Sequence, residues 1–313
     1  MGTYVLRRLL HAVPVLLGVT LVTFLLFNVV CGDPAVVLVG GKKVTAEKIE
    51  AERRRLGTDR PLPAQYVSFL GEIARFDFGT SWKLQKDRPV LEMLGEGVAP
   101  SLSLALPAFL LSLAVSLSLA LFCAYYRGSV ADVSTVIVTV AMMSVPALSY
   151  ILFGQYWLAH QWHMFPVFGF QPGLAGLASL GLPILIWVLL SLGSEIRFYR
   201  SVMLEEMRKD YVRTAAAKGL GTGRILFKHV LKNGMIPVIT RVIVTIPFLM
   251  LGSLLLERFF GIPGLGSITV DAVFQSDLPV IKAVVVISAL LLVVFNLLTD
   301  ICYALVDPRV RLK

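Results

Sequence analysis

The chain has 313 residues, of which 57% are hydrophobic and only 16% are charged, and its mean hydropathy is +0.79. A soluble domain is typically about a quarter charged, so the composition argues against a single soluble core and excludes a disordered chain. The class that remains is a multi-pass membrane protein. The net charge is +9, and in such a protein the position of the cations indicates orientation rather than nucleic-acid binding.

Six apolar segments are long enough to cross about 30 Å of hydrocarbon, which takes about 20 helical residues. The first follows a basic start, as in a signal peptide, but its apolar run is too long for one, and we expect an uncleaved span. The third segment contains Pro146, and the fourth contains Glu195 and Arg197. The expected spans are 9–30, 100–125, 133–158, 180–202, 235–256 and 280–305.

Lys and Arg are unevenly distributed between the short connecting segments. If there are six spans, the segments that carry them fall on one side of the membrane, and the opposite short loops, 160–179 and 259–279, contain none. Because short cytoplasmic loops carry the excess of Lys and Arg, both termini are predicted to be cytoplasmic, in a multi-pass protein of the plasma (inner) membrane. The cations are Arg7, Arg8, Arg127, Arg208, Lys209, Arg213, Lys218, Arg224, Lys228, Lys232, Arg309, Arg311 and Lys313.

The long loop 32–99 carries eleven Lys or Arg against ten Asp or Glu, and long loops cross the membrane largely regardless of charge. Its sequence predicts two helices. Thr45 can cap the first, with Glu47 in its first turn and Gly57 just beyond its end. Pro63 can begin the second, whose apolar residues recur at helical spacing. We expect a small helical insertion outside the membrane; the alternative is a solvated loop with amphipathic pieces.

The segment 203–236 interrupts the apolar chain with a basic, alanine-rich sequence. Residues 203–218 are rich in strong helix formers, and Gly219 is typical of the residue that follows a helix end. A second helix is predicted to begin at Thr222 or Gly223. Small side chains around the glycine turn allow another surface to approach closely, which favours a docking element for a cytoplasmic partner. The alternative is an amphipathic loop that lies on the membrane.

Residues 210–240, DYVRTAAAKGLGTGRILFKHVLKNGMIPVIT, resemble the coupling loop of permease subunits of ABC importers in the dipeptide, oligopeptide and nickel branch. Arg213, Thr214 and Ala215 stand where the general permease pattern has Glu-Ala-Ala, and Gly219 follows. The resemblance covers essentially the whole chain. It also includes LRRLLHAVPVLLGVTLVTFLLF, GDPA, LGTDRPLPAQYVSFL, FDFGTSW, ERFFGIPGLG, SDLPVIKA and DICYALVDPRVR.

The resemblance implies an all-α membrane protein with six transmembrane helices, the type I ABC importer permease fold. It would be one permease domain, 1–313, with the external insertion 32–99 and the cytoplasmic coupling loop 203–236. Such a chain forms half of the pathway that passes peptides or peptide-like solutes from an external binding protein to the cytoplasm.

The implied partners are a homologous second permease subunit, two ATPase subunits, an external substrate-binding protein and the lipid bilayer, with no nucleic acid. The chain carries no ATPase motif, so it is not expected to be an enzyme or to bind a cofactor, and ATP and magnesium are expected in the partner subunits. The implied ATPase contact is Asp210, Tyr211, Arg213, Thr214, Ala215, Ala216, Ala217, Lys218, Gly219 and Leu220.

Charged and polar residues inside spans are costly, and they mark ion pairs or a substrate pathway. Arg241 and Asp300 lie at similar depths from the cytoplasmic side, which predicts an ion pair; the alternative is an Arg241 side chain that snorkels to the interface. Glu195 has no partner on its own helix, so it either faces the pathway and meets the amino terminus of a ligand or pairs with another helix. The remaining candidates, for the pathway or for interhelical hydrogen bonds, are Asn28, Gln155 and Asn296.

Other functions find less support in the sequence. GGKKVT and GLGTGR fail the phosphate-loop and dinucleotide-binding patterns, and no catalytic constellation is apparent. His160 and His163 are spaced as a possible ligand pair, but His11 and His229 are predicted on the opposite side of the membrane, so no metal site is expected. An ion-coupled secondary transporter would show inverted repeats and broken helices around midplane charges, and we see no clear repeat. Within the importer family, a nickel chelate or glutathione is the alternative substrate.

Overall fold

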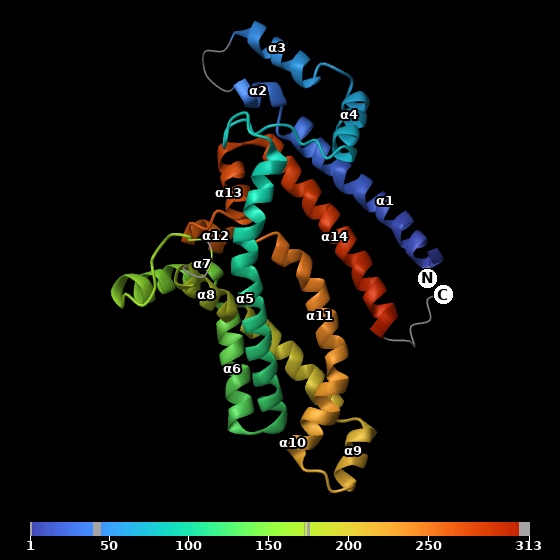
Figure 1. Ribbon diagram of the computed structural model, residues 1–313, viewed down its shortest axis with the longest axis vertical. Helices are drawn as coiled ribbons and strands as arrows, with labels where there is room; N and C mark the ends of the chain where they lie inside the picture. Colours follow the sequence, from blue (N-terminus) through green and yellow to red (C-terminus); the bar gives the residue numbers. More distant parts are fainter. Residues whose placement is uncertain (1, 40–44, 172, 174–175, 307–313) are drawn as a thin grey trace. The chain divides into compact units, whose positions relative to one another are not determined.

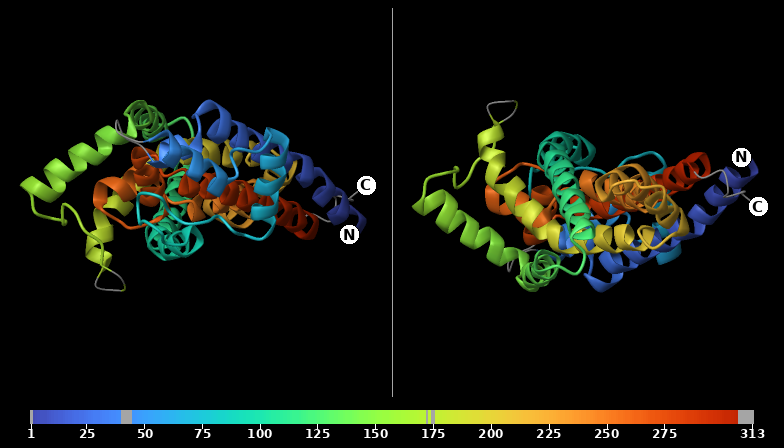
Figure 2. Two further views of the ribbon diagram at one scale, coloured as in Figure 1. Left: turned by 90° about the horizontal axis from the view of Figure 1, so that it is seen from above. Right: turned by 90° about the horizontal axis from the view of Figure 1, so that it is seen from below.

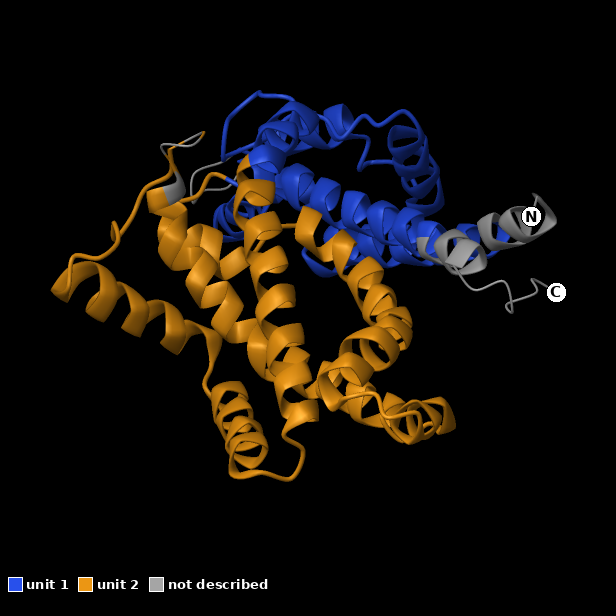
Figure 3. Cartoon of the chain, turned by 60° about the horizontal axis from the view of Figure 1, so that its bottom comes forward, with its two compact units in different colours: residues 1–99, 264–313 blue, residues 100–263 orange. Residues whose placement is uncertain are grey.

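The computed structural model describes the backbone of residues 2–39, 45–171, 173 and 176–306, and it describes no side chains for 2–9, 177 and 299–306. The described part consists of α-helices and short π-helical turns, with one isolated β-bridge between Thr80 and Pro89. This confirms the predicted all-α class. The chain divides into two compact units, residues 1–99 with 264–313, and residues 100–263 (Figure 3).

The first unit contains the segment predicted to be an external insertion. Its longest helices, α1 (Gly2–Leu25) and α14 (Leu278–Val306), lie side by side (Figure 1). A π-helical turn, Leu26–Val30, continues α1. The rest of the unit comprises α2 (Pro34–Val39), α3 (Ala46–Leu56), α4 (Leu62–Ala74), the start of α5 (Val90–Tyr125) and α13 (Leu265–Gln275).

The second unit contains the rest of α5 and the helices up to α12. Within it, α6 (Val130–Ser144) packs along α8 (Leu177–Glu206), which also contacts α11 (Lys232–Met250). The remaining elements are α7 (Ala147–Gly154) with the π-helical turn Gln155–Gln161, α9 (Asp210–Ala217), α10 (Thr222–Ile225) with the π-helical turn Leu226–Leu231, and α12 (Leu254–Phe260).

The two helices predicted within the loop 32–99 are confirmed. α3 follows Thr45 and ends at Gly57, whose φ of 67° is in the left-handed region that favours glycine. Thr45 takes the capping position, but its side chain makes no capping hydrogen bond. α4 carries Pro63 in its first turn, where the missing N–H of proline costs nothing.

Among the described residues, five helices are long and apolar enough to cross a membrane: Leu10–Val30, Val90–Tyr125, Ala178–Glu206, Thr222–Met250 and Leu278–Leu298. A sixth candidate consists of α6 and α7, which are bent by 91° at the break between them (Figure 2). The predicted third span, 133–158, is therefore two helices, and it counts as one span only if the bent pair crosses the membrane as a unit. Val145 is extended because the ring of Pro146 disfavours a helical conformation at the residue before it.

The second and fifth spans differ from prediction in extent. α5 begins at Val90 rather than at residue 100, and it holds two prolines inside the helix. α11 ends at Met250 rather than at residue 256. Gly252 then adopts a φ of +73°, and a Cβ at this position would lie 2.1 Å from Oε1 of Glu257. The chain turns where no side chain fits, so α12 starts as a separate helix.

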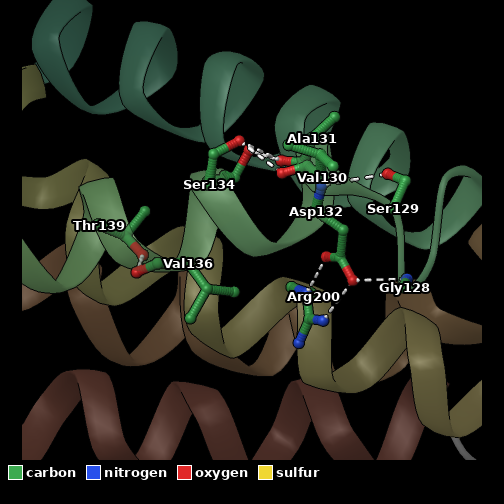
Figure 4. Close-up of polar contacts among 10 residues, drawn as sticks. Gly128, Ser129, Val130, Ala131, Asp132, Ser134, Val136, Thr139 and Arg200 are labelled. Carbon is green, nitrogen blue, oxygen red and sulfur yellow. Dashed lines mark hydrogen bonds and ion pairs between the residues drawn. The ribbon is translucent and has the colours of Figure 1, made fainter.

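An ion pair joins α6 to α8 within the second unit. Arg200 donates from Nε and Nη2 to the two carboxylate oxygens of Asp132 at 2.6 and 2.8 Å, and the Gly128 N–H donates to the same carboxylate at 3.0 Å (Figure 4). The Asp132 residue is only 2% exposed. A planar guanidinium suits this bidentate geometry, so the pair sets the register of the two helices.

Candidate functional site

The predicted docking segment, 203–236, contains more breaks than its sequence suggested. α8 ends at Glu206, and α9 begins at Asp210 after Lys209, whose ψ of 151° is extended. The single helix predicted over 203–218 is therefore wrong. The second predicted helix begins at Thr222 but is not separate, because α10 continues through its π-helical turn into α11 (Figure 1).

Glu206 lies at the break between α8 and α9 and joins them. The residue is buried, at 8% exposure, and its side chain accepts hydrogen bonds from Lys209 Nζ at 2.6 Å and from the Tyr211 hydroxyl. The Tyr211 hydroxyl also interacts with the side chain of Asn233 in α11. Hydrogen bonds to an ionised acceptor are stronger than neutral ones, so side chains hold α9 against the ends of two long helices.

The same contacts shift the acid–base behaviour of the two donors. Burial raises the pKa of the Tyr211 hydroxyl to about 12, and the hydrogen bond to Glu206 acts in the same direction. The hydrogen bond to Glu206 likewise raises the pKa of the Lys209 ammonium. Both donors therefore remain protonated at neutral pH, and the attachment of α9 is intact there.

The predicted glycine turn closes α9. Gly219 has a φ of +79°, its N–H donates to the Ala216 carbonyl at 2.9 Å, and the next N–H donates to the Ala215 carbonyl at 3.3 Å. These bonds satisfy the last carbonyls of the helix. No atom lies within 4 Å of the position that a Cβ would take at Gly219. The turn is therefore strained for other residues but open on its outer side.

α9 has an inner and an outer face. Ala215, at 5% exposure, packs with Val212 in a core that includes Met203 and Val230, and Tyr211 and Leu220 are partly buried against it. The structure thus places three of the ten predicted contact residues on or near the inner face. We call the seven exposed ones the outer face of α9: Asp210, Arg213, Thr214, Ala216, Ala217, Lys218 and Gly219.

Glu195, in α8, has an interhelical partner. Ser116 of α5 donates a hydrogen bond from Oγ to its Oε2 at 2.9 Å, and the positive charge of Arg241 in α11 acts on the same carboxylate. The Arg241 guanidinium also lies 5.4 Å from the centre of the Phe198 ring, at cation–π distance. Of the two interpretations of Glu195, this geometry favours contact with other helices.

The predicted ion pair between Arg241 and Asp300 stays a prediction, because the Asp300 side chain lies outside the described residues. Gln155 donates from Nε2 to the backbone carbonyls of Val167 and Phe259 at 3.2 and 2.9 Å, so it joins segments of the second unit. Asn296 is exposed on α14. The pathway candidates are therefore not gathered into one site by the described contacts.

Asn28 lies in the first unit, in the π-helical turn after α1. Its Nδ2 donates to Gln65 Oε1 at 3.4 Å, and its Oδ1 accepts from Lys282 Nζ at 2.6 Å. Asn28 was predicted as a polar residue near the end of a span, but nothing in the sequence indicated that Gln65 and Lys282 are its hydrogen-bond partners.

Asp277 is a further buried acid that sequence reasoning did not single out. It is fully buried and accepts hydrogen bonds from Ser81 Oγ at 2.6 Å and from the backbone N–H groups of Trp82, Lys83 and Leu84 at 3.1, 2.9 and 2.9 Å. Burial alone would raise the pKa of its carboxyl, but the four hydrogen bonds outweigh burial and lower it. Asp277 lies in the resembling stretch SDLPVIKA, Ser81 and Trp82 end the stretch FDFGTSW, and only the fold joins the two stretches.

Comparison with known proteins places the sequence in a family. Residues 116–312 match the family described as binding-protein-dependent transport system inner membrane component, and residues 1–89 match the corresponding N-terminal family. The chain is 35% identical to the probable peptide ABC transporter permease protein y4tP of Sinorhizobium fredii, with 99% of this chain and 100% of that protein covered.

Two further relatives are similar over their full length. The oligopeptide transport system permease protein AppB of Bacillus subtilis is 35% identical, and the dipeptide transport system permease protein DppB of Alkalihalophilus pseudofirmus is 30% identical; in each case 99% of this chain and 100% of the relative are covered. Together with the all-helical fold and its apolar spans, these matches identify the chain as a multi-pass inner membrane component of the binding-protein-dependent transport system family.

Proposed function

We propose that this chain is the permease subunit of an ATP-driven importer and forms half of the pathway by which short peptides reach the cytoplasm. The names of its relatives support peptides as the substrate class. The distribution of Lys and Arg supports an orientation with both termini and the segment 203–236 in the cytoplasm. A homologous second permease would supply the other half of the pathway.

The outer face of α9 carries this proposal. It presents small and cationic side chains around an open glycine turn, while the inner face is packed into the core and joined to Glu206. A surface of this kind lets a partner approach the backbone closely. We propose that two ATPase subunits, which bind ATP and magnesium, dock on this face and on its counterpart in the second permease.

The attachment of α9 suggests how such a partner would act on the spans. Tyr211 and Glu206 connect α9 to α8, and Tyr211 also reaches α11. If ATP closes the ATPase pair, α9 moves with it and shifts the population of the bundle from inward-facing to outward-facing. An external binding protein then delivers the peptide, and ATP hydrolysis resets the bundle.

Replacement of Gly219 tests the docking assignment. Gly219→Leu puts a bulky side chain on the outer face of α9. We expect peptide uptake in proteoliposomes with all partner subunits to fall by at least about tenfold, which corresponds to a loss of about 1.4 kcal/mol in the free energy of docking. Membrane insertion should be unchanged because the site is open within this chain.

Gly128→Leu is the matched control. Gly128 also has a positive φ, of +77°, and also has no atom within 4 Å of a Cβ position, so both variants carry similar backbone strain of about 1–2 kcal/mol. It lies outside α9, between α5 and α6. Equal uptake by the two variants would count against docking on α9.

A further inference from the structure

A cavity of about 530 Å³ lies within the first unit. Residues of α4, of the turn between α3 and α4, of the segment 77–82 and of the start of α14 line it. Its volume is within the range of about 300–1,000 Å³ that is usual for small-molecule sites. The sequence resemblance assigned no role to these residues as a group.

A chain of hydrogen bonds orients Lys282 at this cavity. Gln65 Nε2 donates to the backbone carbonyls of Thr58 and Arg60 at 3.0 and 2.7 Å, and its Oε1 accepts from Asn28 Nδ2. Asn28 in turn accepts from the Lys282 ammonium at 2.6 Å. One of the three Lys282 donors is thereby used, and the ammonium is held in one position with donors to spare.

The cavity contains charges of both signs but more cations than acids. Lys282, Arg54 and Arg60 line it, and within the described part of the chain no carboxylate forms an ion pair with any of the three. Glu72 lines it as well, one turn along α4 from Phe69. Burial raises the pKa of the Glu72 carboxyl, the positive charge of Lys282 opposes this rise, and the negative charge of Asp77, which also lines the cavity, adds to it.

Apolar side chains complete the lining. Phe69, Phe78 and Trp82 contribute aromatic surface beside these charged groups, and the Lys282 ammonium lies 5.8 Å from the centre of the Phe69 ring. A cationic end, a carboxylate and an aromatic wall together match a small zwitterion that has an apolar part. Inorganic anions would leave the aromatic wall and Glu72 without a counterpart.

We propose that this cavity is a binding site for a short zwitterionic peptide, with Lys282 and Arg60 receiving its carboxylate and Glu72 its amino group. The inference rests on the proposed function, because the peptide class comes from there and the orientation proposed there puts the loop 32–99 outside the membrane. It adds a peptide site in the permease chain itself, beside its outer loop, which a peptide would occupy before or after transfer from the binding protein.

The test is a titration of the full chain in lipid nanodiscs with trialanine, followed by saturation-transfer NMR. We expect saturable binding of trialanine. The affinity should fall at least about tenfold for trialaninamide, which lacks the carboxylate, and for trialanine with the Lys282→Gln and Arg60→Gln variants. Each change removes one charge-assisted hydrogen bond. N-acetyl-trialanine, which lacks the free amino group, should bind more weakly by a similar factor. The Glu72→Gln variant should bind trialanine more weakly by a similar factor.

Arg75→Gln is the matched control, because Arg75 is an exposed arginine at the end of α4 that does not line the cavity. Arg60 is also exposed, so its variant is informative even if Lys282→Gln folds poorly. The inference would be overturned if trialanine showed no saturable binding, if trialaninamide bound as tightly as trialanine, or if Arg75→Gln weakened binding as much as Arg60→Gln. It would also be overturned if the cavity bound an acidic surface of the external binding protein and not trialanine.

A parallel uptake assay separates this inference from the proposed function. Trialanine binding without ATP-driven peptide uptake would contradict the proposed function and leave the site in place. Normal uptake by a chain that binds no trialanine would overturn the site and leave the proposed function in place.

Discussion

Two segments of this chain are each held in place by hydrogen bonds to one buried carboxylate, but the two carboxylates accept from different kinds of donor. Asp277 holds residues 81–84 of the long loop with one hydroxyl and three backbone N–H groups. Glu206 holds α9 with the side chains of Lys209 and Tyr211. Backbone donors fix the path of the chain itself, whereas side-chain donors can rotate away. The loop is therefore attached as a static element, and α9 is attached as one that can move with a partner.

Removal of the Asp277 carboxylate should have the largest effect on stability. Asp277→Ala leaves three backbone N–H groups and a buried hydroxyl without their acceptor, and we expect a loss of about 3–5 kcal/mol in the free energy of unfolding. Thermal unfolding of the full chain in detergent measures the loss, and proteolysis after Lys83 and Lys86 reports on the loop itself. Asp59→Ala, at an exposed position in the same loop, is the control and should change little.

If Asp277→Ala destabilises the chain no more than Asp59→Ala does, backbone attachment is not what holds the loop, and the contrast with α9 fails.

Neutralisation of Glu206 should have a smaller effect on stability and a specific effect on coupling. Glu206→Gln keeps an acceptor but weakens both hydrogen bonds, at a cost of about 1–2 kcal/mol, which corresponds to a factor of about 5–30 in the population of attached α9. We expect fewer peptides transported per ATP hydrolysed, as measured in proteoliposomes, with ATP hydrolysis retained.

Glu205→Gln is the matched control for this variant, because Glu205 is the preceding residue and is exposed. A drop in coupling of equal size in both variants would show that general charge near the break, rather than the attachment through Glu206, is responsible.

Changes in pH should break the hydrogen bonds of Asp277 and those of Tyr211 at opposite ends of the pH scale. Near neutral pH both sets of hydrogen bonds should remain intact. The pKa of Asp277 is lowered, so its contribution is complete above the unfolded value of about 3.9 and is lost as the pH falls through the folded value. The pKa of Tyr211 is raised to about 12, so its contribution is complete below the unfolded value of about 10 and is lost as the pH rises toward 12.

Spin labels at positions 86 and 218 of a chain without reactive cysteines would follow the two releases. The label at 86 should become mobile in acid and stay immobile in alkali, and the label at 218 should become mobile in alkali. Asp277→Asn should abolish the acid transition and Tyr211→Phe the alkaline one. An alkaline transition that survives in Tyr211→Phe would assign it to another group, and the attachment of α9 would then need another explanation.

Local signals in the sequence predicted the helices well where the cause of each boundary was local. Thr45 and Gly57 bound α3, Pro63 is the second residue of α4, and Gly219 follows the end of α9, because helix ends and left-handed turns depend on a few adjacent residues. The break at 207–209 was missed, since strong helix formers continue through it and the acceptor that favours it is the buried Glu206.

Long-range pairings could not be predicted in the same way. Ser81 and Asp277 are 196 residues apart, and Asp132 and Arg200 are 68 residues apart. Ser129 and Asp132 form a recognisable capping signal at the start of α6, but no pattern in the sequence connects this acid to α8. Which face of α9 is buried was likewise not predicted, although Tyr211, Val212 and Ala215 lie on one side of the helix.

The sequence by itself determined that this protein is an all-helical membrane component, where most spans lie, and which segment bears the glycine turn. These follow from hydropathy, helix-capping residues and the placement of Lys and Arg, all of which act over one or two helical turns. Only the tertiary structure decided which acids are buried as attachments, which side of α9 remains exposed, and that Lys282, Glu72 and Arg60 line one cavity. Those outcomes depend on contacts between segments distant in the chain, and burial gives such contacts their strength.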